Sequence, residues 1–333
     1  MLIISMELKD LDIKDRKILA ILDWNARIPT SEIAKKVQLS KPSVQYRINQ
    51  LEKAGVIRGY YPVINFLKLG MNIGRVSLKF QNITPAVRSN IEKYVQHKKH
   101  IYWGTWCRGA IDLGIGIGSK NSLDFKKNFN HFNKRFGKYI QERSFTTSTG
   151  FIQVPYRFIL NNSSSEKMEV LFTSEPFYLD ILDFAILKII NQDARQNASE
   201  IAQAVNSNYK TVLYRMRKLQ ENGILIGFRA AIDHRFFNLE YYKVLFYFNY
   251  YSDEIYEKLK KFICSYKQMI YFVYHVNSDL DAEFLFNSDD EFYTLLDAIN
   301  EQFPGLIKRY SITILIDNFK INYLPYLDEY IKR

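Results

Sequence analysis

Hydrophobic positions in residues 11–60 follow the helical period in three stretches separated by short polar breaks. The first stretch places Ile18, Leu19 and Leu22 on one face, as a helix packed on a core requires. The third places Val44 and Ile48 on one face in the same way. Three short helices with a tight turn before the last predict a helix-turn-helix unit. The residues expected to cap or end these helices are Asp12, Thr30, Ser40 and Gly55.

The hydrophobic period changes from helical to alternating after residue 60. Residues 56–64 look extended, as a wing or hinge strand, and residues 75–81 alternate as a half-buried strand does. Four phenylalanines between residues 125 and 136 fall on one helical face, which indicates packing against a sheet. Glycines at 114, 116 and 118 lie in strand-like sequence and lack the spacing of a phosphate loop. The order βαββαβ over residues 73–160 predicts a ferredoxin-like domain.

The whole pattern occurs twice, at a constant offset of 168 residues. Residues 11–60 align with residues 179–228 without a gap, including Ala26 with Ala194 and Arg27 with Arg195. Two long copies indicate a duplicated protein and not a solenoid. We therefore expect an α+β fold, a tandem duplication of a winged helix-turn-helix domain followed by a ferredoxin-like βαββαβ domain. The expected boundaries are 1–60, hinge 61–72 and 73–160 for copy 1, linker 161–178, then 179–228, hinge 229–240 and 241–326 for copy 2.

Charge is distributed unequally between the copies. The chain has a net charge of +11, yet residues 1–168 hold 28 Lys and Arg against 12 Asp and Glu, a net charge of +16. The remaining residues carry a net charge of −5. A basic half suits a polyanionic partner, because neutralised phosphates release counterions.

Several classes of site are not expected. The two cysteines, Cys107 and Cys264, lie far apart, which favours a reducing compartment over a disulfide framework. The five histidines show no metal-ligand spacing, so we expect no metal and no cofactor. The N-terminal residues lack a basic region and a cleavage-like site, and no apolar run could span a membrane. We expect a cytoplasmic protein.

The third helix and its exit carry a family resemblance. Residues 39–57 read LSKPSVQYRINQLEKAGVI. Together with the opening of the first helix, this segment resembles the recognition helix of the leucine-responsive regulatory protein (Lrp/AsnC) family. The resemblance implies a DNA-binding transcriptional regulator whose βαββαβ domain mediates dimerisation and can sense small molecules such as amino acids. In copy 2, Ser207 to Thr211 depart from this pattern, which puts the DNA contacts of that copy in doubt.

The face of the third helix that points away from the core supplies the candidate DNA contacts, because early residues of this helix reach base edges in the major groove. Arg47 has two interpretations: it clamps a phosphate, or it pairs with Glu32 on the preceding helix. No arginine stands out as a bidentate guanine reader, so modest selectivity aided by DNA shape is expected. The candidates are Lys41, Ser43, Tyr46, Arg47, Asn49, Gln50 and Lys53 in copy 1, and Lys210, Tyr214 and Arg215 in copy 2.

A candidate effector site follows from the resemblance, which implies amino-acid binding near a Gly-x-x-Asp turn. That turn reads Gly109-Ala-Ile-Asp112, and copy 2 has Ser278-Asp-Leu-Asp281 without the glycine. Glycine lets backbone amides approach a carboxylate, and the aspartate can accept from an ammonium group. The alternative is that Gly109 only makes a tight turn that Asp112 caps.

Two functions from different classes fit the duplicated architecture. The first is a sequence-selective regulator that binds double-stranded DNA chiefly through copy 1, with the two βαββαβ domains packed as an intrachain pseudo-dimer. The second is an enzyme, since siroheme decarboxylases resemble Lrp-family proteins and can occur as two fused copies. Residues 101–109 supply Tyr102 and Arg108 but no histidine cluster for a porphyrin pocket. We therefore expect a regulator with no catalytic residues and no enzyme activity.

Overall fold

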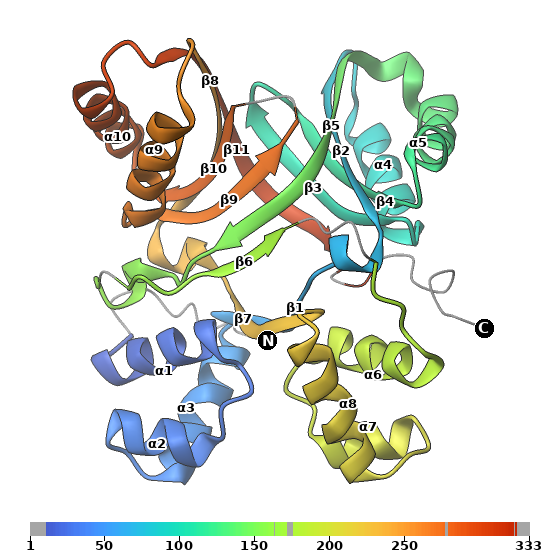
Figure 1. Cartoon of the computed structure of the whole chain (residues 1–333), viewed down its shortest axis with the longest axis vertical. Helices are drawn as coiled ribbons and strands as arrows, with labels where there is room; N and C mark the ends of the chain where they lie inside the picture. The colour runs from blue at the N-terminus through green and yellow to red at the C-terminus, as the bar shows by residue number, and fades with distance from the viewer. Residues whose placement is uncertain (1–10, 163, 172–175, 277–278, 323, 325–333) are drawn as a thin grey trace.

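Two helical heads lie at one end of the molecule and a large sheet covered by helices forms the other end (Figure 1). The computed structural model describes residues 11–162, 164–171, 176–276, 279–322 and 324. The N-terminal residues 1–10, on which the expectation about a signal peptide rests, lie outside the described residues. No helix in these ranges is long and apolar enough to cross a membrane.

Each head contains three helices, as the hydrophobic period predicted. The side chain of Asp12 accepts from the backbone N–H groups of Lys14 and Asp15, which forms the expected cap of the first helix. The expectation that Thr30 caps the second helix is wrong, because Thr30 is already its first residue and Pro29 precedes it without a side-chain cap. The helices are α1 (Ile13–Trp24), α2 (Thr30–Val37) and α3 (Lys41–Lys53) in copy 1, and α6 (Ile181–Gln192), α7 (Ala198–Ala204) and α8 (Tyr209–Glu221) in copy 2.

A two-stranded antiparallel ribbon joins the two heads to the sheet. It consists of β1 (Ile57–Ile64) and β7 (Leu225–Ile232), one strand from each copy. The heads also bond to the ribbon strand of the other copy: the Ala26 N–H donates to the Phe228 carbonyl at 2.9 Å, and the Ala194 N–H to the Tyr60 carbonyl at 3.2 Å. The ribbon therefore fixes how the two heads sit relative to each other.

The strands of the two βαββαβ domains form one continuous sheet. In hydrogen-bonded order it runs β2-β4-β3-β11-β8-β10-β9-β5-β6, and β2 also pairs with β5, which closes a ring of eight strands. The copy 1 elements are β2 (Asn72–Phe80), α4 (Pro85–His97), β3 (Ile101–Gly109), β4 (Leu113–Ser119), α5 (Ser122–Phe136) and β5 (Ile140–Gln153). The copy 2 elements are β8 (Glu240–Phe248), α9 (Asp253–Ser265), β9 (Met269–His275), β10 (Leu280–Phe286), α10 (Asp289–Gln302) and β11 (Ile307–Ile321).

The last strand of each copy crosses from its own domain to the other. Strand β5 pairs with β2 as far as Ser148 and with β9 from Ser148 onward. Strand β11 pairs with β8 as far as Leu315 and with β3 from Thr313 onward. The two domains are thus joined within one chain. The segment expected to be an irregular linker contains a further strand, β6 (Met168–Leu171), which pairs with β5.

Short 3-10 turns precede or follow several strands. They span Leu67–Leu69, Gly137–Tyr139, Arg157–Ile159 and His234–Phe237. The helices of each domain cover the outside of the ring (Figure 1). Phe129, Phe132 and Phe136 are buried between α5 and the sheet, as their spacing predicted.

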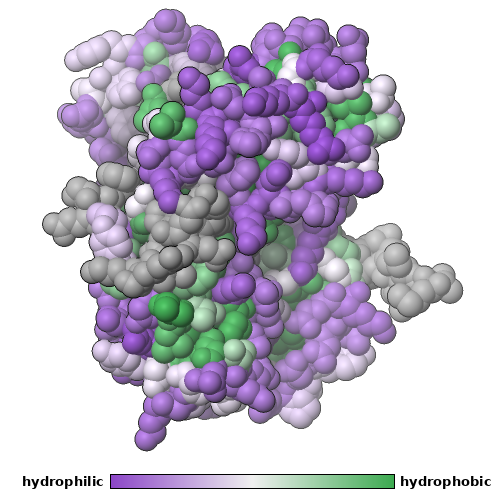
Figure 2. Space-filling model, turned by 90° about the vertical axis from the view of Figure 1, so that its right-hand side faces the viewer, coloured by the Kyte–Doolittle hydropathy of each residue, from purple (hydrophilic) through white to green (hydrophobic). Residues whose placement is uncertain are grey.

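The surface differs between the equivalent first helices of the two heads. Ile181 of α6 and its equivalent Ile13 of α1 are both exposed, and Figure 2 shows an apolar patch in the lower half of the face on which α6 lies. Copy 2 has Leu182, Phe184 and Ala185 where copy 1 has the basic side chains of residues 14, 16 and 17. The two heads share a backbone but present different chemistry.

Candidate nucleic-acid interface

Helix α3 presents a polar face at the surface of the first head. The Ser40 hydroxyl accepts from the Ser43 N–H at 3.2 Å, which caps the helix as expected. Val44, Ile48 and Leu51 are buried against the rest of the head. The opposite face carries the polar candidates, and the Tyr46 side chain is 65% exposed. Of the copy 1 candidates, the exposed ones are Lys41, Ser43, Tyr46, Asn49 and Lys53, and the half-buried ones are Arg47 and Gln50.

Arg47 does not pair with Glu32, so that interpretation is wrong. Its Nη1 lies 2.8 Å from a carboxylate oxygen of Asp12 and 2.8 Å from one of Asp15. The guanidinium therefore ties the recognition helix to the N-terminus of α1, where a carboxylate also caps the helix. Burial acts to raise the pKa of Asp12, but hydrogen bonds from the Asp15 backbone and from Arg47 lower it overall.

Arg215 repeats this contact in the second head. It pairs with Asp180 and lies 3.4 Å from a carboxylate oxygen of Asp183. The pKa of Asp180 is lowered overall, because hydrogen bonds from the Asp183 backbone and from Arg215 outweigh the effect of burial. A contact present in both copies at equivalent positions is best explained as part of the head's own structure.

Helix α8 has an exposed face that the sequence reasoning underestimated. Tyr214 is 62% exposed, and Lys210 is exposed as expected. Arg217 and Lys218 stand where copy 1 has Asn49 and Gln50. The offset of 168 would have identified both cations. The recognition helix of copy 2 is therefore no less basic than that of copy 1.

Arginines at equivalent positions fix each head to the other copy. Arg27 Nη1 donates to the carbonyls of Ala194 and Gln196 at 2.6 and 2.9 Å. Arg195 Nη1 donates to the Tyr60 hydroxyl at 3.3 Å. These identical positions were visible in the sequence, but their crossed contacts were not. The two recognition helices therefore belong to one rigid pair of heads.

The predicted effector turn is held by internal contacts. Gly109 has a φ of +100°, and a side chain there would approach the Ile312 carbonyl oxygen to 2.7 Å. The Asp112 carboxylate accepts from the Lys79 ammonium at 2.9 Å and from the Phe80 N–H at 2.8 Å. Both oxygens are thus engaged, as the turn-capping alternative predicts.

The copy 2 counterpart of Asp112 is Asp279 and not Asp281. The Asp279 carboxylate accepts from the Phe248 N–H at 2.7 Å, and Phe248 is equivalent to Phe80. The shift is visible in the strand register: Leu78 pairs with Leu113, whereas its equivalent Phe246 pairs with Leu280, which is 167 residues after Leu113. Ser278, which the sequence analysis placed in this turn, lies outside the described residues.

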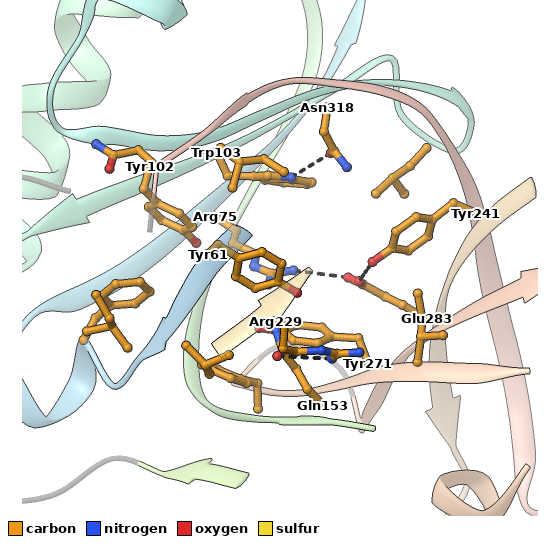
Figure 3. A pocket seen from close by; sticks show the side chains of 18 of the residues that line it. Tyr61, Arg75, Tyr102, Trp103, Gln153, Arg229, Tyr241, Tyr271, Glu283 and Asn318 are labelled. Carbon is orange, nitrogen blue, oxygen red and sulfur yellow. Dashed lines mark hydrogen bonds and ion pairs between the residues drawn. The ribbon is translucent and has the colours of Figure 1, made fainter. Parts of the chain in front are cut away.

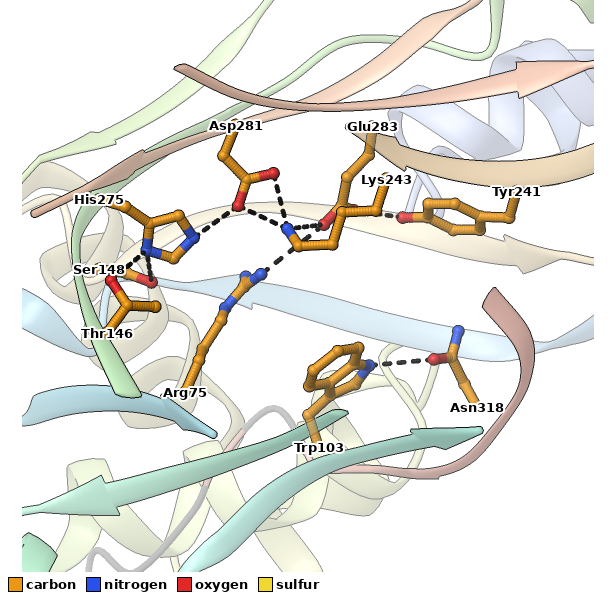
Figure 4. A network of polar contacts seen from close by, with 10 residues as sticks. All are labelled: Arg75, Trp103, Thr146, Ser148, Tyr241, Lys243, His275, Asp281, Glu283 and Asn318. Atoms are coloured by element: carbon orange, nitrogen blue, oxygen red, sulfur yellow. Dashed lines mark hydrogen bonds and ion pairs between the residues drawn. The ribbon is translucent and has the colours of Figure 1, made fainter. Parts of the chain in front are cut away.

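Asp281 belongs to a buried polar network inside the strand ring (Figure 4). It accepts from Lys243 Nζ at 2.6 Å and lies 2.6 Å from His275 Nε2. Lys243 Nζ also lies 3.0 Å from a Glu283 oxygen, which in turn lies 3.7 Å from Arg75 Nη1 of copy 1. Burial acts to raise the pKa of Asp281, but Lys243 and His275 lower it overall.

Copy 2 supplies a histidine, His275, that the sequence-based argument against a porphyrin pocket did not consider. The segment 101–109 lacks histidine, but its copy 2 equivalent ends in His275 at the position of Cys107. Its Nδ1 lies 3.3 Å from the Ser148 hydroxyl of copy 1. Burial lowers the pKa of His275. Among the described residues, no group of three His, Cys, Asp or Glu side chains could hold a metal ion.

Comparisons with known proteins give a family model that matches both copies and relatives of about the length of one copy. A winged helix-turn-helix DNA-binding family model matches residues 11–58 and again residues 179–226. The proline dehydrogenase transcriptional activator of Rhodobacter capsulatus is 46% identical over 118 residues, 35% of this chain and 77% of that protein. The HTH-type transcriptional regulator LrpA of Pyrococcus horikoshii is 44% identical over 122 residues, 33% of this chain and 85% of that protein.

A comparison of structures gives a likeness over both copies together. The crystal structure of the siroheme decarboxylase NirDL matches with a TM-score of 0.62 and 14% sequence identity over 95% of each chain. At this identity the likeness shows the fold alone. It still contradicts our expectation that the chain is not an enzyme, because an enzyme is built on the same duplicated fold. The expectation failed because it judged the missing histidines from one copy only.

The family itself follows from the motif, the fold and the relatives. Both heads have the recognition helix on which the resemblance was based, and both are followed by the βαββαβ arrangement. Relatives above 40% identity are covered over more than two thirds of their length. The chain belongs to the Lrp/AsnC family and contains two copies of the family's unit.

Proposed function

We propose that this protein is a transcriptional regulator that binds double-stranded DNA through its two helix-turn-helix heads. The observation that carries the proposal is the pair of exposed recognition helices, α3 and α8, held at one end of the molecule by the β1–β7 ribbon (Figure 1). The two relatives described above are named as a transcriptional activator and a transcriptional regulator, which supports it. Two unlike heads on one rigid support suit an asymmetric site with two half-sites.

The recognition helices of the two heads differ in their polar side chains, and this difference suggests different roles in DNA binding. Asn49 and Gln50 on α3 carry amides, which can pair with adenine edges, so α3 supplies sequence selectivity. Arg217 and Lys218 at the equivalent positions of α8 suit phosphates. We infer that copy 1 dominates selectivity and that copy 2 adds affinity.

A binding experiment with matched variants tests the proposal. Genomic fragments selected by the full chain supply the DNA, and affinity is measured at several salt concentrations. Replacing Lys41 and Tyr46 by alanine should weaken binding to the selected site far more than replacing their equivalents Tyr209 and Tyr214. Equal losses would refute the division between the heads. Affinity for DNA that does not fall with salt would contradict a phosphate-dominated interface.

A second candidate is an enzyme acting on a tetrapyrrole. The likeness to siroheme decarboxylase over 95% of each chain favours it, and a related structure of that enzyme is a complex with an iron-uroporphyrin III analogue. His275 and Arg75 lie together inside the strand ring, where such chemistry could be placed. Purified protein incubated anaerobically with siroheme, and analysed for carbon dioxide loss by mass spectrometry, tests this. An unchanged substrate mass, with no shift of the siroheme absorbance, would reject this candidate.

A further inference from the structure

A chamber of about 210 Å³ lies between the ribbon and the strand ring (Figure 3). Its walls come from both copies and from both layers, with Tyr61 on the ribbon strand β1 and Arg229 on β7. An interior enclosed by eight strands is just wide enough to be filled by side chains or to hold one small ligand. The chamber is smaller than the roughly 300–1,000 Å³ of pockets for drug-sized ligands.

Aromatic rings form a large part of the chamber wall. Tyr61, Tyr102, Trp103, Tyr241 and Tyr271 all line it, and they come from four different strands. Figure 3 shows these rings arranged around the space. Flat, rigid rings favour a planar apolar ligand because they offer large contact area at little entropic cost.

Two polar groups on this wall lack hydrogen-bond partners within the described part of the chain. They are Arg75 Nε and the Tyr102 hydroxyl, and both atoms are buried. The Arg75 guanidinium also lies over the Trp103 ring, 5.5 Å from its centroid. Leaving a buried donor unsatisfied costs about 1–3 kcal/mol, more for a charged group. A ligand that brings an acceptor would remove this cost.

The neighbouring charges decide the sign of that ligand. Glu283 is the acid on the wall, and its oxygens already accept from the Tyr241 hydroxyl at 2.6 Å and from Lys243 Nζ at 3.0 Å. Arg75 contacts Glu283 at 3.7 Å, and its guanidinium also lies beside the Tyr102 hydroxyl, but its Nε has no acceptor within the described residues. The Arg75 guanidinium therefore has an N–H without an acceptor, and a cationic donor of this kind favours an anionic acceptor in the chamber.

We propose that this chamber binds a small planar aromatic carboxylate. Its ring packs between the aromatic walls, and its carboxylate accepts from Arg75 Nε and from the Tyr102 hydroxyl. Asn318, whose amide oxygen accepts from Trp103 Nε1 at 3.0 Å, holds that ring in place beside the ligand. None of these contacts involves the turn at Gly109, so the site is separate from the effector turn expected from the sequence.

A second hollow gives the ligand a path from the surface. It measures about 360 Å³ and shares Tyr61, Tyr156 and Tyr241 with the chamber. It is also lined by Arg58 and Arg235, and both of these arginines pair with Asp233. The shared residues make it a vestibule to the chamber.

Binding of this ligand would also affect the DNA-binding end of the molecule, an inference that rests on the proposed function. Tyr61, Val63 and Ile64 of β1 line the chamber, and β1 is the strand that follows the first head. A ligand that bridges ribbon and ring would fix the position of the pair of heads relative to the strand ring. Aromatic acid and DNA would then change each other's affinity by the same factor.

Calorimetry on the full chain with a matched pair of probes tests the site. Indole-3-acetate should bind with a stoichiometry of one, whereas indole-3-acetamide, which lacks the charge, should bind at least about tenfold more weakly. Arg75→Gln should reduce the affinity for the acid by about tenfold or more. Tyr102→Phe, which keeps the ring, should reduce it several-fold. The surface variant Arg108→Gln, whose native partner is Glu240, should bind normally.

The outcomes separate the site from the regulatory role. Equal binding of acid and amide, tighter binding of the cationic analogue tryptamine, or no binding of the acid would overturn the proposal. If Arg75→Gln does not fold, Tyr102→Phe carries the test alone. Acid binding without any change in DNA affinity would remove only the link to the heads. Loss of DNA binding in every condition, with acid binding intact, would refute the proposed function and leave the site standing.

Discussion

The two copies differ most where they meet inside the strand ring. Copy 1 places Arg75, Gly114, Gly116 and Cys107 at four equivalent positions of this interior. Copy 2 places Lys243, Asp281, Glu283 and His275 there. The helix-facing side of the sheet is apolar in both copies. The two copies have therefore kept the apolar packing between helices and sheet, and they differ in the surface through which the two domains pair.

The glycines of copy 1 and the acids of copy 2 have complementary consequences. A side chain at Gly114 or Gly116 would collide with the rings of Trp103 or Tyr102, at 2.8 and 2.3 Å. The glycines thus leave room for the aromatic chamber wall. The acids of copy 2 supply the carboxylate that Arg75 contacts.

This asymmetry favours pairing within one chain over pairing of like copies. Two copy 1 domains would bring together two Arg75 side chains without the acids at 281 and 283. The contact of Arg75 with Glu283 exists only when unlike copies meet. Specificity of this kind arises from the cost of an unpaired buried charge in the wrong complex. We infer that the intrachain arrangement persists in solution.

The largest expected difference between the copies concerns buried carboxylates. Asp281→Asn should lower the free energy of unfolding by about 3 kcal/mol, because the buried Lys243 then keeps only Glu283 as an acidic partner. Asp112→Asn in copy 1 should cost about 1–2 kcal/mol, since Asp112 is partly exposed and only caps a turn. Urea denaturation at pH 7 measures both. Similar losses in the two variants would show that the buried polar network stabilises the fold no more than the capped turn at Asp112 does.

The pH dependence of stability should separate the copies next. His100 of copy 1 corresponds to Gln268, and burial, with help from nearby lysines, lowers the His100 pKa to about 4. The unfolded chain binds this proton at its ordinary pKa of 6.5, so stability is full above pH 6.5 and is lost as the pH falls toward 4. Because the side chain is partly exposed, we expect a loss of about 1–2 kcal/mol.

The variant His100→Gln copies the residue of the second half and serves as the control. Unfolding monitored by circular dichroism from pH 7 to pH 4 should show a flatter profile for this variant. His275, whose pKa is also lowered by burial, remains in it and contributes in the same direction. An unchanged profile would show that His100 does not contribute to the loss of stability in acid.

A smaller effect concerns the arginines that tie each recognition helix to the first helix of its head. Arg47→Met and Arg215→Met should each cost about 0.5–1 kcal/mol, because both ion pairs are partly exposed. If Arg47 stabilises the head through Asp12, then Asp12→Asn should lower the free energy of unfolding only slightly further in the Arg47→Met background. A double-mutant cycle measures this coupling. Full additivity, with a reduced salt dependence of DNA binding, would instead make Arg47 a phosphate contact.

The finest distinction between the heads lies in the salt dependence of DNA binding. Replacing Arg217 and Lys218 by glutamine should lower the slope of log affinity against log salt by about 2. Replacing Asn49 and Gln50 by alanine should leave the slope unchanged and reduce the preference for the selected site. Filter binding at several salt concentrations measures both properties. The reverse pattern would exchange the roles of α3 and α8.

The local structure of the heads was predictable because its causes are local. Caps at Asp12 and Ser40, the buried face of α3 and the left-handed Gly55 all depend on residues close in sequence. Thr30 failed as a cap because Pro29 holds the extended backbone before the helix, which the sequence reasoning did not weigh.

Contacts between distant segments were not predictable in the same way. The offset between the copies changes from 168 to 167 at the turn before β10, so the counterpart of Asp112 was misassigned. Arg47 was assigned the wrong acid because its partners Asp12 and Asp15 lie more than thirty residues away in sequence, at the start of the first helix. His275 was overlooked because its neighbours Ser148 and Asp281 come from different strands.

The sequence by itself determined the duplication, the order of helices and strands, the recognition helices and the family. It could do so because hydrophobic period, capping and motif spacing act over a few residues and recur at a fixed offset. Only the tertiary structure decided which charges meet inside the ring, that both heads bind the ribbon strand of the other copy, and that an aromatic chamber lies beneath it. Those features depend on side chains brought together by strand pairing between residues more than a hundred positions apart, and no local pattern encodes that geometry.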